Sequence, residues 1–339
     1  MAAKTLITGG AGFIGSHLVE HIKAQGRDLV VVDNLSSGLE SNIQPLLDVH
    51  CQLIASSVRD AVDEYPKLFA DIDEVYHLAA SVGVRTAVAT PIGTITNNIE
   101  ETRLVLEQAK QQNARVLICS SSEVYGKPMR QPMSEDDDLV IGPPRCSRWS
   151  FALSKAVAEQ LSLAFAYQHG LAVTVVRLFN TIGPRQVGDY GMVVPRFVQR
   201  AVRGDDLEIH GDGSQRRSFC DVQDVVSVMP RLLACEGSHG QVFNIGGDTE
   251  ISIDQLADLV IELSGGDIRK RYVPYDQAFG PGFEDPARRI PDLSKLREII
   301  DYTPRYDLRE TLSKLIRLAK QEHRTAVSPR HRRGKDQFL

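Results

Sequence analysis

The stretch Thr8-Gly9-Gly10-Ala11-Gly12-Phe13-Ile14-Gly15 stands between two segments of different hydrophobic period. Before it, Lys4–Thr8 is a short apolar run of the kind that forms a buried strand. After it, Ile14–Gln25 repeats apolar residues at helical spacing. The stretch therefore predicts a tight turn between a strand and a helix, and this unit decides the fold.

Three glycines in this turn are spaced as GxxGxxG. A residue without a Cβ permits a tight turn, a close approach of the backbone to a phosphate, and close contact between helix and strand. The positive end of the helix, at Phe13 and Ile14, favours an anion at the same place. Gly9, Gly12 and Gly15 therefore predict a site for the pyrophosphate of a dinucleotide.

An aspartate closes the next strand-like run, Asp28–Asp33. A carboxylate at this position accepts hydrogen bonds from the adenosine ribose and repels a 2′-phosphate. Asp33 therefore favours NAD over NADP, although the nearby Arg27 leaves NADP open as an alternative.

Strands and helices continue to alternate through the first half of the chain. The expected strands are Val75–Leu78, Ala114–Ser120 and Ala172–Leu178, and the expected helices are Ile99–Gln112 and Leu153–His169. Alternation of this kind implies parallel strands with helices on both faces of the sheet. We therefore predict an α/β protein with a Rossmann-type, doubly wound parallel sheet.

After Gly183, proline and glycine separate shorter elements. We expect a dinucleotide-binding domain over residues 1–182, a smaller substrate-binding α/β part over 183–322, and a basic flexible tail over 323–339. Residues 218–246 contain a helical and a strand-like run, so this segment is also a candidate to return to the main sheet.

Composition excludes several classes of protein. The 339 residues carry a net charge of −5, which gives no general attraction to nucleic acid or to an anionic membrane. No apolar stretch approaches the length of a membrane span, and no signal peptide is evident. The five cysteines lack CxxC pairing, which favours reduced thiols and a cytoplasmic protein. His17 and His21 lack an HExxH pattern, so we expect an exposed helix face and no metal site.

Five motifs together resemble the extended short-chain dehydrogenases/reductases that act on nucleotide sugars. They are Thr8–Gly15, Asp33-Asn34-Leu35, His77-Leu78-Ala79-Ala80, Ser120–Gly126 and Lys155. The resemblance extends from the N-terminus to about Leu318. It implies a tightly held NAD that oxidises C4 of a UDP-sugar, and a homodimer formed through the helices predicted at Ile99–Gln112 and Leu153–His169.

The resemblance also implies roles for individual residues. Ser121 would bind O4 of the sugar, and Lys155 would hold the nicotinamide ribose and lower the pKa of the catalytic base. The residues expected to contact the cofactor are Gly9, Gly12, Phe13, Ile14, Gly15, Asp33, Asn34, Ser37, Leu78, Ala79, Ala80, Asn98 and Lys155. Those expected to contact the substrate are Ser122, Asn180, Arg185, Val194, Arg217 and Arg288.

One asparagine and two arginines are expected at the anionic groups of the substrate. Asn180 would touch the diphosphate, and Arg217 and Arg288 are charge partners for the anionic groups, because guanidinium groups bind phosphate bidentately. Arg289 directly follows Arg288, and the sequence leaves open which of the two points inward.

Position 151 departs from the family pattern. The YxxxK tyrosine of the family corresponds to Phe151, four residues before Lys155. Phenylalanine keeps the ring but has no proton to exchange. Two interpretations follow: a tyrosine substituted deliberately to trap a complex, or a natural divergence in which catalysis is lost or rerouted. Both predict that binding survives while turnover is impaired.

The pair Ser122-Glu123 separates the reactions of the family. In 4,6-dehydratases an aspartate at the first position expels the C6 hydroxyl, and Ser122 cannot do so efficiently. Simple 4-epimerases usually lack an acid at the second position, that of Glu123. The pair resembles the UDP-glucuronate decarboxylase group, in which C4 oxidation makes a β-keto acid that loses carbon dioxide. Glu123 and Arg217 are then candidates to orient the carboxylate and manage protons.

Three alternatives remain. The protein could be an NDP-hexose or UDP-glucuronate 4-epimerase, a 4,6-dehydratase, or a non-catalytic protein that binds NAD and a nucleotide sugar. The first shares every proposed residue except the role of Glu123, and Phe151 favours the last.

Overall fold

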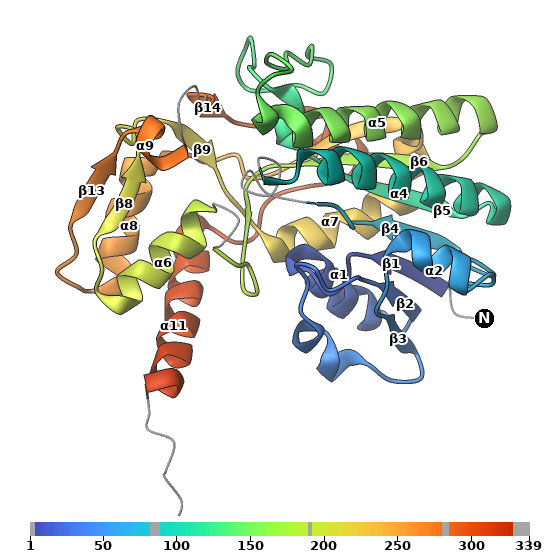
Figure 1. Cartoon of the computed structure of the whole chain (residues 1–339), viewed down its shortest axis with the longest axis horizontal. Coiled ribbons are helices and arrows are strands. Elements are labelled where there is room, and N and C mark those ends of the chain that lie inside the picture. The colour runs from blue at the N-terminus through green and yellow to red at the C-terminus, as the bar shows by residue number, and fades with distance from the viewer. Residues whose placement is uncertain (1–3, 82–88, 189–191, 280–284, 328–339) are drawn as a thin grey trace, which may run out of the picture.

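A seven-stranded parallel sheet forms the centre of the larger part of the molecule (Figure 1). The computed structural model describes residues 4–81, 89–188, 192–279 and 285–327. All neighbouring strands of this sheet run parallel. From edge to edge the strands are β11 (Gln241–Ile245), β6 (Val173–Leu178), β5 (Arg115–Ser121), β4 (Glu74–His77), β1 (Lys4–Thr8), β2 (Asp28–Val32) and β3 (Cys51–Ile54).

The strand order confirms the predicted doubly wound fold. From β1 the chain builds outward through β2 to β3, and then returns to build the other half from β4 to β11. The carboxyl ends of β1 and β4, at Thr8 and His77, therefore flank the point where the direction reverses. Ligands of such sheets bind in the crevice outside the carboxyl ends of the strands at this point.

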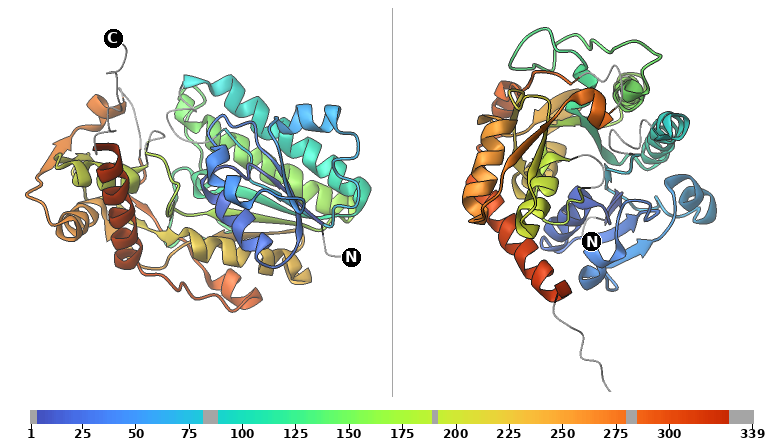
Figure 2. Two further views of the ribbon diagram at one scale, coloured as in Figure 1. Left: turned by 90° about the horizontal axis from the view of Figure 1, so that it is seen from below. Right: turned by 60° about the vertical axis from the view of Figure 1, so that its left-hand side comes forward.

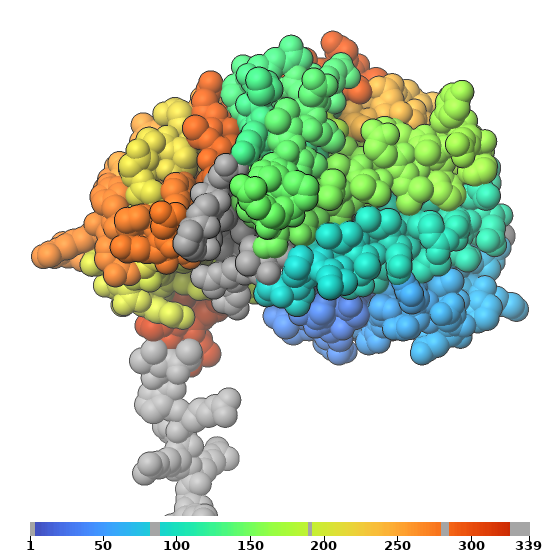
Figure 3. Space-filling model, turned by 45° about the horizontal axis from the view of Figure 1, so that its top comes forward, coloured from blue at the N-terminus to red at the C-terminus, as the bar shows by residue number. Residues whose placement is uncertain are grey.

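Helices cover both faces of the sheet (Figures 1 and 2). One face carries α1 (Phe13–Lys23), α7 (Val222–Ala234) and α10 (Ser294–Ile299); the other carries α2 (Val58–Glu64), α4 (Pro91–Gln112) and α5 (Ser150–His169). Helices α4 and α5 pack against each other, and Figure 3 shows them side by side on one surface.

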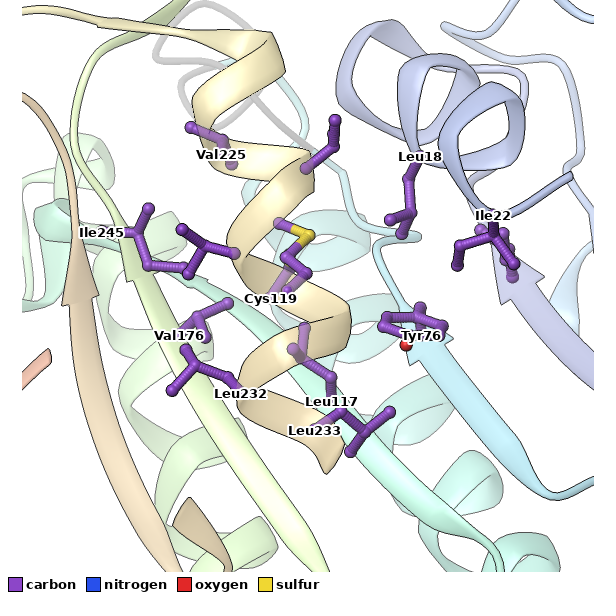
Figure 4. Packing of buried hydrophobic residues seen from close by; sticks show 14 of the residues in the cluster. Leu18, Ile22, Tyr76, Leu117, Cys119, Val176, Val225, Leu232, Leu233 and Ile245 are labelled. Atoms are coloured by element: carbon purple, nitrogen blue, oxygen red, sulfur yellow. The ribbon is translucent and has the colours of Figure 1, made fainter. Parts of the chain in front are cut away.

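Strand β5 shows how the sequence produces two cores. Alternate side chains of a strand point to opposite faces. Leu117 and Cys119 pack against α1 and α7, as Figure 4 shows, whereas Val116 and Ile118 pack under α4 and α5. All four side chains are buried, which is why β5 reads as a continuous apolar run.

The smaller part of the molecule is a mixed α/β unit at one end of the sheet (Figure 1). Its apolar core lies between α6, α8 and α11. Its elements are β7 (Thr181–Ile182), α6 (Val193–Arg203), β8 (Leu207–His210), β9 (Arg216–Ser218), β10 (Cys220–Asp221), β12 (Glu250–Ser252), α8 (Ile253–Ser264), β13 (Lys270–Val273), α9 (Tyr275–Phe279), β14 (Arg288–Arg289) and α11 (Leu308–Val327).

Several boundaries differ from the sequence-based expectation. Helix α4 begins at Pro91 rather than Ile99. The sequence-based expectation missed its first turns because the residues buried there, Thr94 and Asn98, are polar and give no apolar period. Strand β3 and helix α2 were not expected. Within the candidate segment 218–246, α7 packs on the main sheet and β11 pairs with β6, whereas Cys220 and Asp221 pair with β7 outside that sheet.

The tail expected to begin at residue 323 is helical up to Val327, because α11 continues that far. Its apolar side packs on α6 and α8, at Leu312 and Ile316. The remaining residues of the expected tail, 328–339, lie outside the described part of the chain.

His17 does not lie on an exposed helix face, so that expectation was wrong. Its side chain is buried where α1 meets the smaller part, and its ring nitrogens lie 3.0 Å from the Pro184 carbonyl oxygen and 3.1 Å from the Gln223 amide nitrogen. Burial lowers its pKa. Among the described residues, no cluster of His, Cys, Asp and Glu is arranged to hold a metal ion.

Candidate active site

A cavity of about 500 Å³ crosses the carboxyl ends of the central strands and continues into the smaller part of the molecule. The glycine turn and the ends of β2, β4 and β5 form one side of it. Residues of α6, β9 and β14 contribute to the other. The cavity therefore has room for two ligands to meet, one held by the sheet and one by the smaller part.

The glycine turn fits a pyrophosphate. Gly9 has φ +71°, and a Cβ there would come within 2.6 Å of the Ala79 nitrogen. A Cβ on Gly15 would lie 2.1 Å from the Gly9 carbonyl oxygen, so any larger residue would push α1 away from the turn. The first turn of α1, at Phe13 and Ile14, also lines the cavity and presents its positive end there.

Asp33 is fixed beside the glycine turn. One carboxylate oxygen accepts a hydrogen bond from the Ala11 backbone nitrogen and the other from that of Leu35, each at 2.9 Å. Asp33, Asn34 and Ser37 all line the cavity, as predicted for the adenosine ribose. Arg27, which had left NADP open, instead pairs with the buried Glu74 at the start of β4, the end of the strand away from the cavity.

Lys155 lies at the floor of the cavity with Ser121 and Phe151 beside it on the cavity wall. The lysine is 4% exposed, and its Nζ donates a hydrogen bond to the Cys119 carbonyl oxygen at 2.7 Å. Burial lowers the pKa of this ammonium group. Phe151 is one helical turn before Lys155 on α5, so a phenol at 151 would lie next to a poorly solvated cation.

Asn98 does not line the cavity as expected, because α4 turns it toward α5. Its Oδ1 accepts a hydrogen bond from the Ser81 backbone nitrogen at 2.8 Å, and its Nδ2 donates to the Ser154 Oγ at 2.9 Å. Ser154 in turn donates to the Phe151 carbonyl oxygen at 2.8 Å. Asn98 therefore positions the loop after β4 and the first turn of α5 rather than contacting a ligand from the cavity wall.

Glu123 lies between two buried arginines. The Arg148 guanidinium donates to it at 3.1 Å, and Arg289 donates to its other oxygen. Burial acts to raise the pKa of the Glu123 carboxyl, but Arg289 and Arg148 outweigh it and bring the pKa to about 2. Glu123 is therefore ionised at neutral pH, so it positions the two arginines and has no proton to donate.

A second carboxylate completes this charged cluster. Asp285 accepts a hydrogen bond from Arg217 at 2.8 Å and lies 3.5 Å from Arg148. We call the set of Glu123, Arg148, Arg217, Asp285 and Arg289 the arginine cluster. All five residues line the cavity, Glu123 and Arg148 from the larger part and Arg217, Asp285 and Arg289 from the smaller part. Three arginines against two carboxylates leave a formal charge of 3 − 2 = +1, which suits an additional anion.

The Glu123→Gln variant should lose stability at neutral pH. A carboxyl whose folded pKa of about 2 lies below its ordinary 4.5 stabilises the fold above pH 4.5, and this contribution disappears as the pH falls toward 2. A shift of this size corresponds to roughly 3 kcal/mol. The thermal unfolding midpoint of the variant should lie below that of the parent at pH 7, and the difference should shrink toward pH 3.

Glu262→Gln is the matched control, because Glu262 forms an exposed ion pair with Arg309. That variant should unfold nearly with the parent at both pH values. A Glu123→Gln deficit that is equal at pH 7 and pH 3 would contradict an ionised, arginine-held Glu123.

The remaining predicted residues divide into two groups. Ser122, Asn180, Val194 and Arg217 line the cavity with Leu78, Ala79, Ala80 and Gly12. Arg185 does not, because its guanidinium pairs with Glu20 at 3.0 Å. Arg288 does not either, since its side chain is 48% exposed and pairs with Glu250.

Arg289 takes the inward place that was expected of Arg288. Neighbouring residues of a strand point to opposite sides, and β14 turns Arg289 into the cavity. Sequence reasoning also missed Arg148 and Asp285. The local sequence around Arg148 and Asp285 carries no signal of their contacts, which are with residues distant in the chain.

The geometry defines a Rossmann-type fold whose cavity joins a dinucleotide-type glycine turn to a cluster of arginines suited to an anion. A model of the NAD dependent epimerase/dehydratase family matches residues 5–246. The chain belongs to this family, and NAD is its cofactor, as predicted.

Two relatives found by sequence are named as decarboxylases. The chain is 38% identical over 317 residues to UDP-N-acetyl-alpha-D-glucosaminuronate decarboxylase of Bacillus cytotoxicus, which covers 93% of this chain and 97% of the relative. It is 36% identical over 311 residues to UDP-glucuronic acid decarboxylase 6 of Arabidopsis thaliana, covering 91% and 86%.

The fold is also that of an epimerase solved with both ligands. UDP-glucuronic acid 4-epimerase from Bacillus cereus, in complex with UDP-glucuronic acid and NAD, superposes with a TM-score of 0.84 at 30% identity, covering 94% of this chain and 99% of that one. These findings confirm the predicted resemblance to extended short-chain dehydrogenases/reductases. In the described ranges, no helix is long and apolar enough to cross a membrane.

Proposed function

We propose that the protein oxidises C4 of a UDP-hexuronate, with UDP-glucuronate as the simplest candidate, and releases the C6 carboxylate as carbon dioxide. The observation that carries this proposal is the arginine cluster, in the same cavity as Ser121 and Lys155. A nucleotide sugar without a carboxylate would need positive charge only at its diphosphate. Glu123, which holds Arg289 and Arg148, directly follows the serine pair that includes Ser121, so these arginines belong to the sugar end of the cavity.

The chain's own residues suit this reaction. NAD, when bound, accepts the hydride from C4. The Ser121 hydroxyl provides a hydrogen bond for O4, and the buried Lys155 favours the loss of a proton nearby, since it stabilises negative charge. In the β-keto acid that results, the bond between C5 and C6 breaks, carbon dioxide leaves, and the electron pair moves to the C4 carbonyl. A proton from water then adds to C5. The hydride would return from the cofactor to C4 and a proton to O4, which gives the UDP-pentose and leaves no net oxidation.

The arginine cluster would orient the carboxylate for this step. Arg289 is 8% exposed and Arg217 is 7% exposed, so their interactions with an anion are little screened by water. Glu123 keeps Arg289 and Arg148 at a fixed separation and, with a pKa of about 2, takes no part in proton transfer. Of the two roles expected of Glu123, we therefore keep the orientation of the carboxylate and abandon the transfer of protons.

A 4-epimerase of UDP-glucuronate is the second candidate. The Bacillus cereus structure supports it, because that protein bound UDP-glucuronic acid in the same fold. An epimerase also binds the carboxylate but must avoid its loss, so an arginine cluster alone does not distinguish the two reactions.

The products distinguish them. The Phe151→Tyr protein is incubated with UDP-glucuronate, and in parallel with UDP-N-acetylglucosaminuronate. Carbon dioxide with a UDP-pentose, from either substrate, is expected. UDP-galacturonate without carbon dioxide would contradict decarboxylation and establish epimerisation. A protein that binds NAD and UDP-glucuronate but forms neither product would support the non-catalytic alternative.

We also propose that the protein is a homodimer. Helices α4 and α5 leave Ile92, Leu153 and Val157 exposed on their outer side, at 78%, 47% and 39%. The protein should have the mass of a dimer in light scattering, and Val157→Glu should shift it toward the monomer, because a buried unpaired charge opposes association. The control is Tyr65→Glu, on the loop after α2. A monomeric parent would contradict the proposal.

A further inference from the structure

Near Asp33 the cavity is also lined by residues to which no role in binding has been given so far. Ser56, Ser57 and Val58, which follow β3, form one side of this end, and Asn97 and Glu101 of α4 form the other. In folds of this type a carboxylate at the position of Asp33 contacts the adenosine ribose. The adenine ring of a bound NAD therefore lies toward this wall.

Glu101 is the charged acceptor on that wall. Its carboxylate accepts a hydrogen bond from the Val58 backbone nitrogen, which holds it across the gap between α4 and α2. Ser57 is engaged locally, because its Oγ donates to Asp60 and accepts from the Asp60 backbone nitrogen. Asn97 carries no charge. Each carboxylate oxygen accepts more than one hydrogen bond, so Glu101 retains capacity toward the cavity.

The neighbouring glutamate has a different environment. Glu100 is 44% exposed and pairs with Arg59 on the outside of the protein, and it does not line the cavity. Two adjacent glutamates on one helix therefore differ in the property that matters here, which is access to the bound dinucleotide.

We propose that Glu101 recognises the adenine of NAD by accepting a hydrogen bond from its exocyclic 6-amino group. The 6-amino group is a hydrogen-bond donor, as the edge of adenine requires. Hypoxanthine carries a carbonyl oxygen in the same place, and two acceptors facing each other in a partly desolvated site repel. Glu101 would therefore select NAD against deamino-NAD, the hypoxanthine analogue.

A competition experiment tests this without any turnover. The protein is incubated with equal concentrations of NAD and deamino-NAD at about pH 8, because burial raises the pKa of Glu101 and a higher pH favours its ionised form. It is then separated from free nucleotide and denatured, and the bound dinucleotides are quantified by chromatography. A hydrogen bond to a charged group changes a binding constant about tenfold or more, so NAD should exceed deamino-NAD by at least that factor.

The Glu101→Gln variant should lose most of this preference, because its amide can donate to the hypoxanthine carbonyl as well as accept from the amino group. Glu101→Ala should also lose it, by removing the acceptor. Glu100→Gln is the matched control and should keep the ratio of the parent. Circular dichroism confirms that each variant is folded.

Near-equal amounts of the two dinucleotides on the parent would overturn the proposal, as would a Glu101→Gln ratio equal to that of the parent. An equal loss of preference in Glu100→Gln would also overturn it, because the effect would then belong to the helix rather than to Glu101. None of these outcomes depends on which sugar the enzyme converts, so the test is separate from that of the proposed reaction.

Discussion

The Phe151→Tyr protein should turn over its UDP-sugar about 10²- to 10⁴-fold faster than the chain with Phe151, the range that a positioned general base contributes. A phenol at 151 would lie one helical turn from Lys155, whose buried ammonium stabilises the phenolate. The chain as it stands has no phenol at that place, although Ser121 and Lys155 still line the cavity. Initial rates of carbon dioxide release at saturating UDP-glucuronate measure the effect.

Phe165→Tyr is the matched control for this comparison. Phe165 lies on the same helix, α5, and packs in the core under the sheet, away from the cavity. The same added hydroxyl should give no gain in rate there. Binding of UDP-glucuronate to the parent and to the Phe151→Tyr protein should differ little. A Phe151→Tyr protein no faster than its parent would contradict the assignment of position 151.

The second large effect is expected for Arg289→Met, made together with Phe151→Tyr so that turnover can be followed. Removing this arginine takes away the proposed partner of the substrate carboxylate and leaves Glu123 with Arg148 alone. Breaking a buried charge pair of this kind costs about 3–5 kcal/mol, so kcat/KM should fall by about 10²-fold or more. The preference for binding UDP-glucuronate over UDP-glucose, measured by calorimetry on the NAD-loaded protein, should also be lost.

Arg288→Met, in the same Phe151→Tyr background, provides a close control, because it removes the adjacent arginine. Arg288 forms an exposed pair with Glu250, and such pairs contribute little. Its kcat/KM and its preference for UDP-glucuronate should stay near those of the Phe151→Tyr protein. Equal losses in the two variants would mean that β14 acts as a structural element and that Arg289 has no specific contact with the carboxylate.

The sequence predicted the parts of the molecule that depend on local rules. The glycine turn follows from the spacing of residues that lack a Cβ, and Asp33 from its place at the end of a strand. The buried strand β5 follows from its continuous apolar run. The structure has the glycine turn and Asp33 at the cavity and β5 in the sheet. The position of Lys155 followed from the family resemblance. Strand β3 was missed because it is a short strand at the edge of the sheet, next to β2, and leaves Gln52 exposed, so its pattern is weak.

Long-range contacts could not be predicted in the same way. Arg288 and Arg289 differ only in which side of a two-residue strand they occupy, and a strand that short carries no periodicity to set its phase. The contact of Arg148 with Glu123 joins the two ends of the long segment between β5 and α5, which are 25 residues apart in the sequence. Glu101 faces the cavity because α4 begins at Pro91 and packs beside α2, an arrangement formed by tertiary packing.

The shared position of Glu123 between two arginines also limits how this protein can evolve. Arg148 belongs to the turn before α5, in the larger part, and Arg289 to β14, in the smaller part. Loss of any one of the three takes a partner from at least one buried charge. Single substitutions at these positions are therefore selected against before they can change substrate preference. If the cluster binds a sugar carboxylate as proposed, a lineage that changes to neutral sugars must replace the three together, or pass through a less stable ancestor.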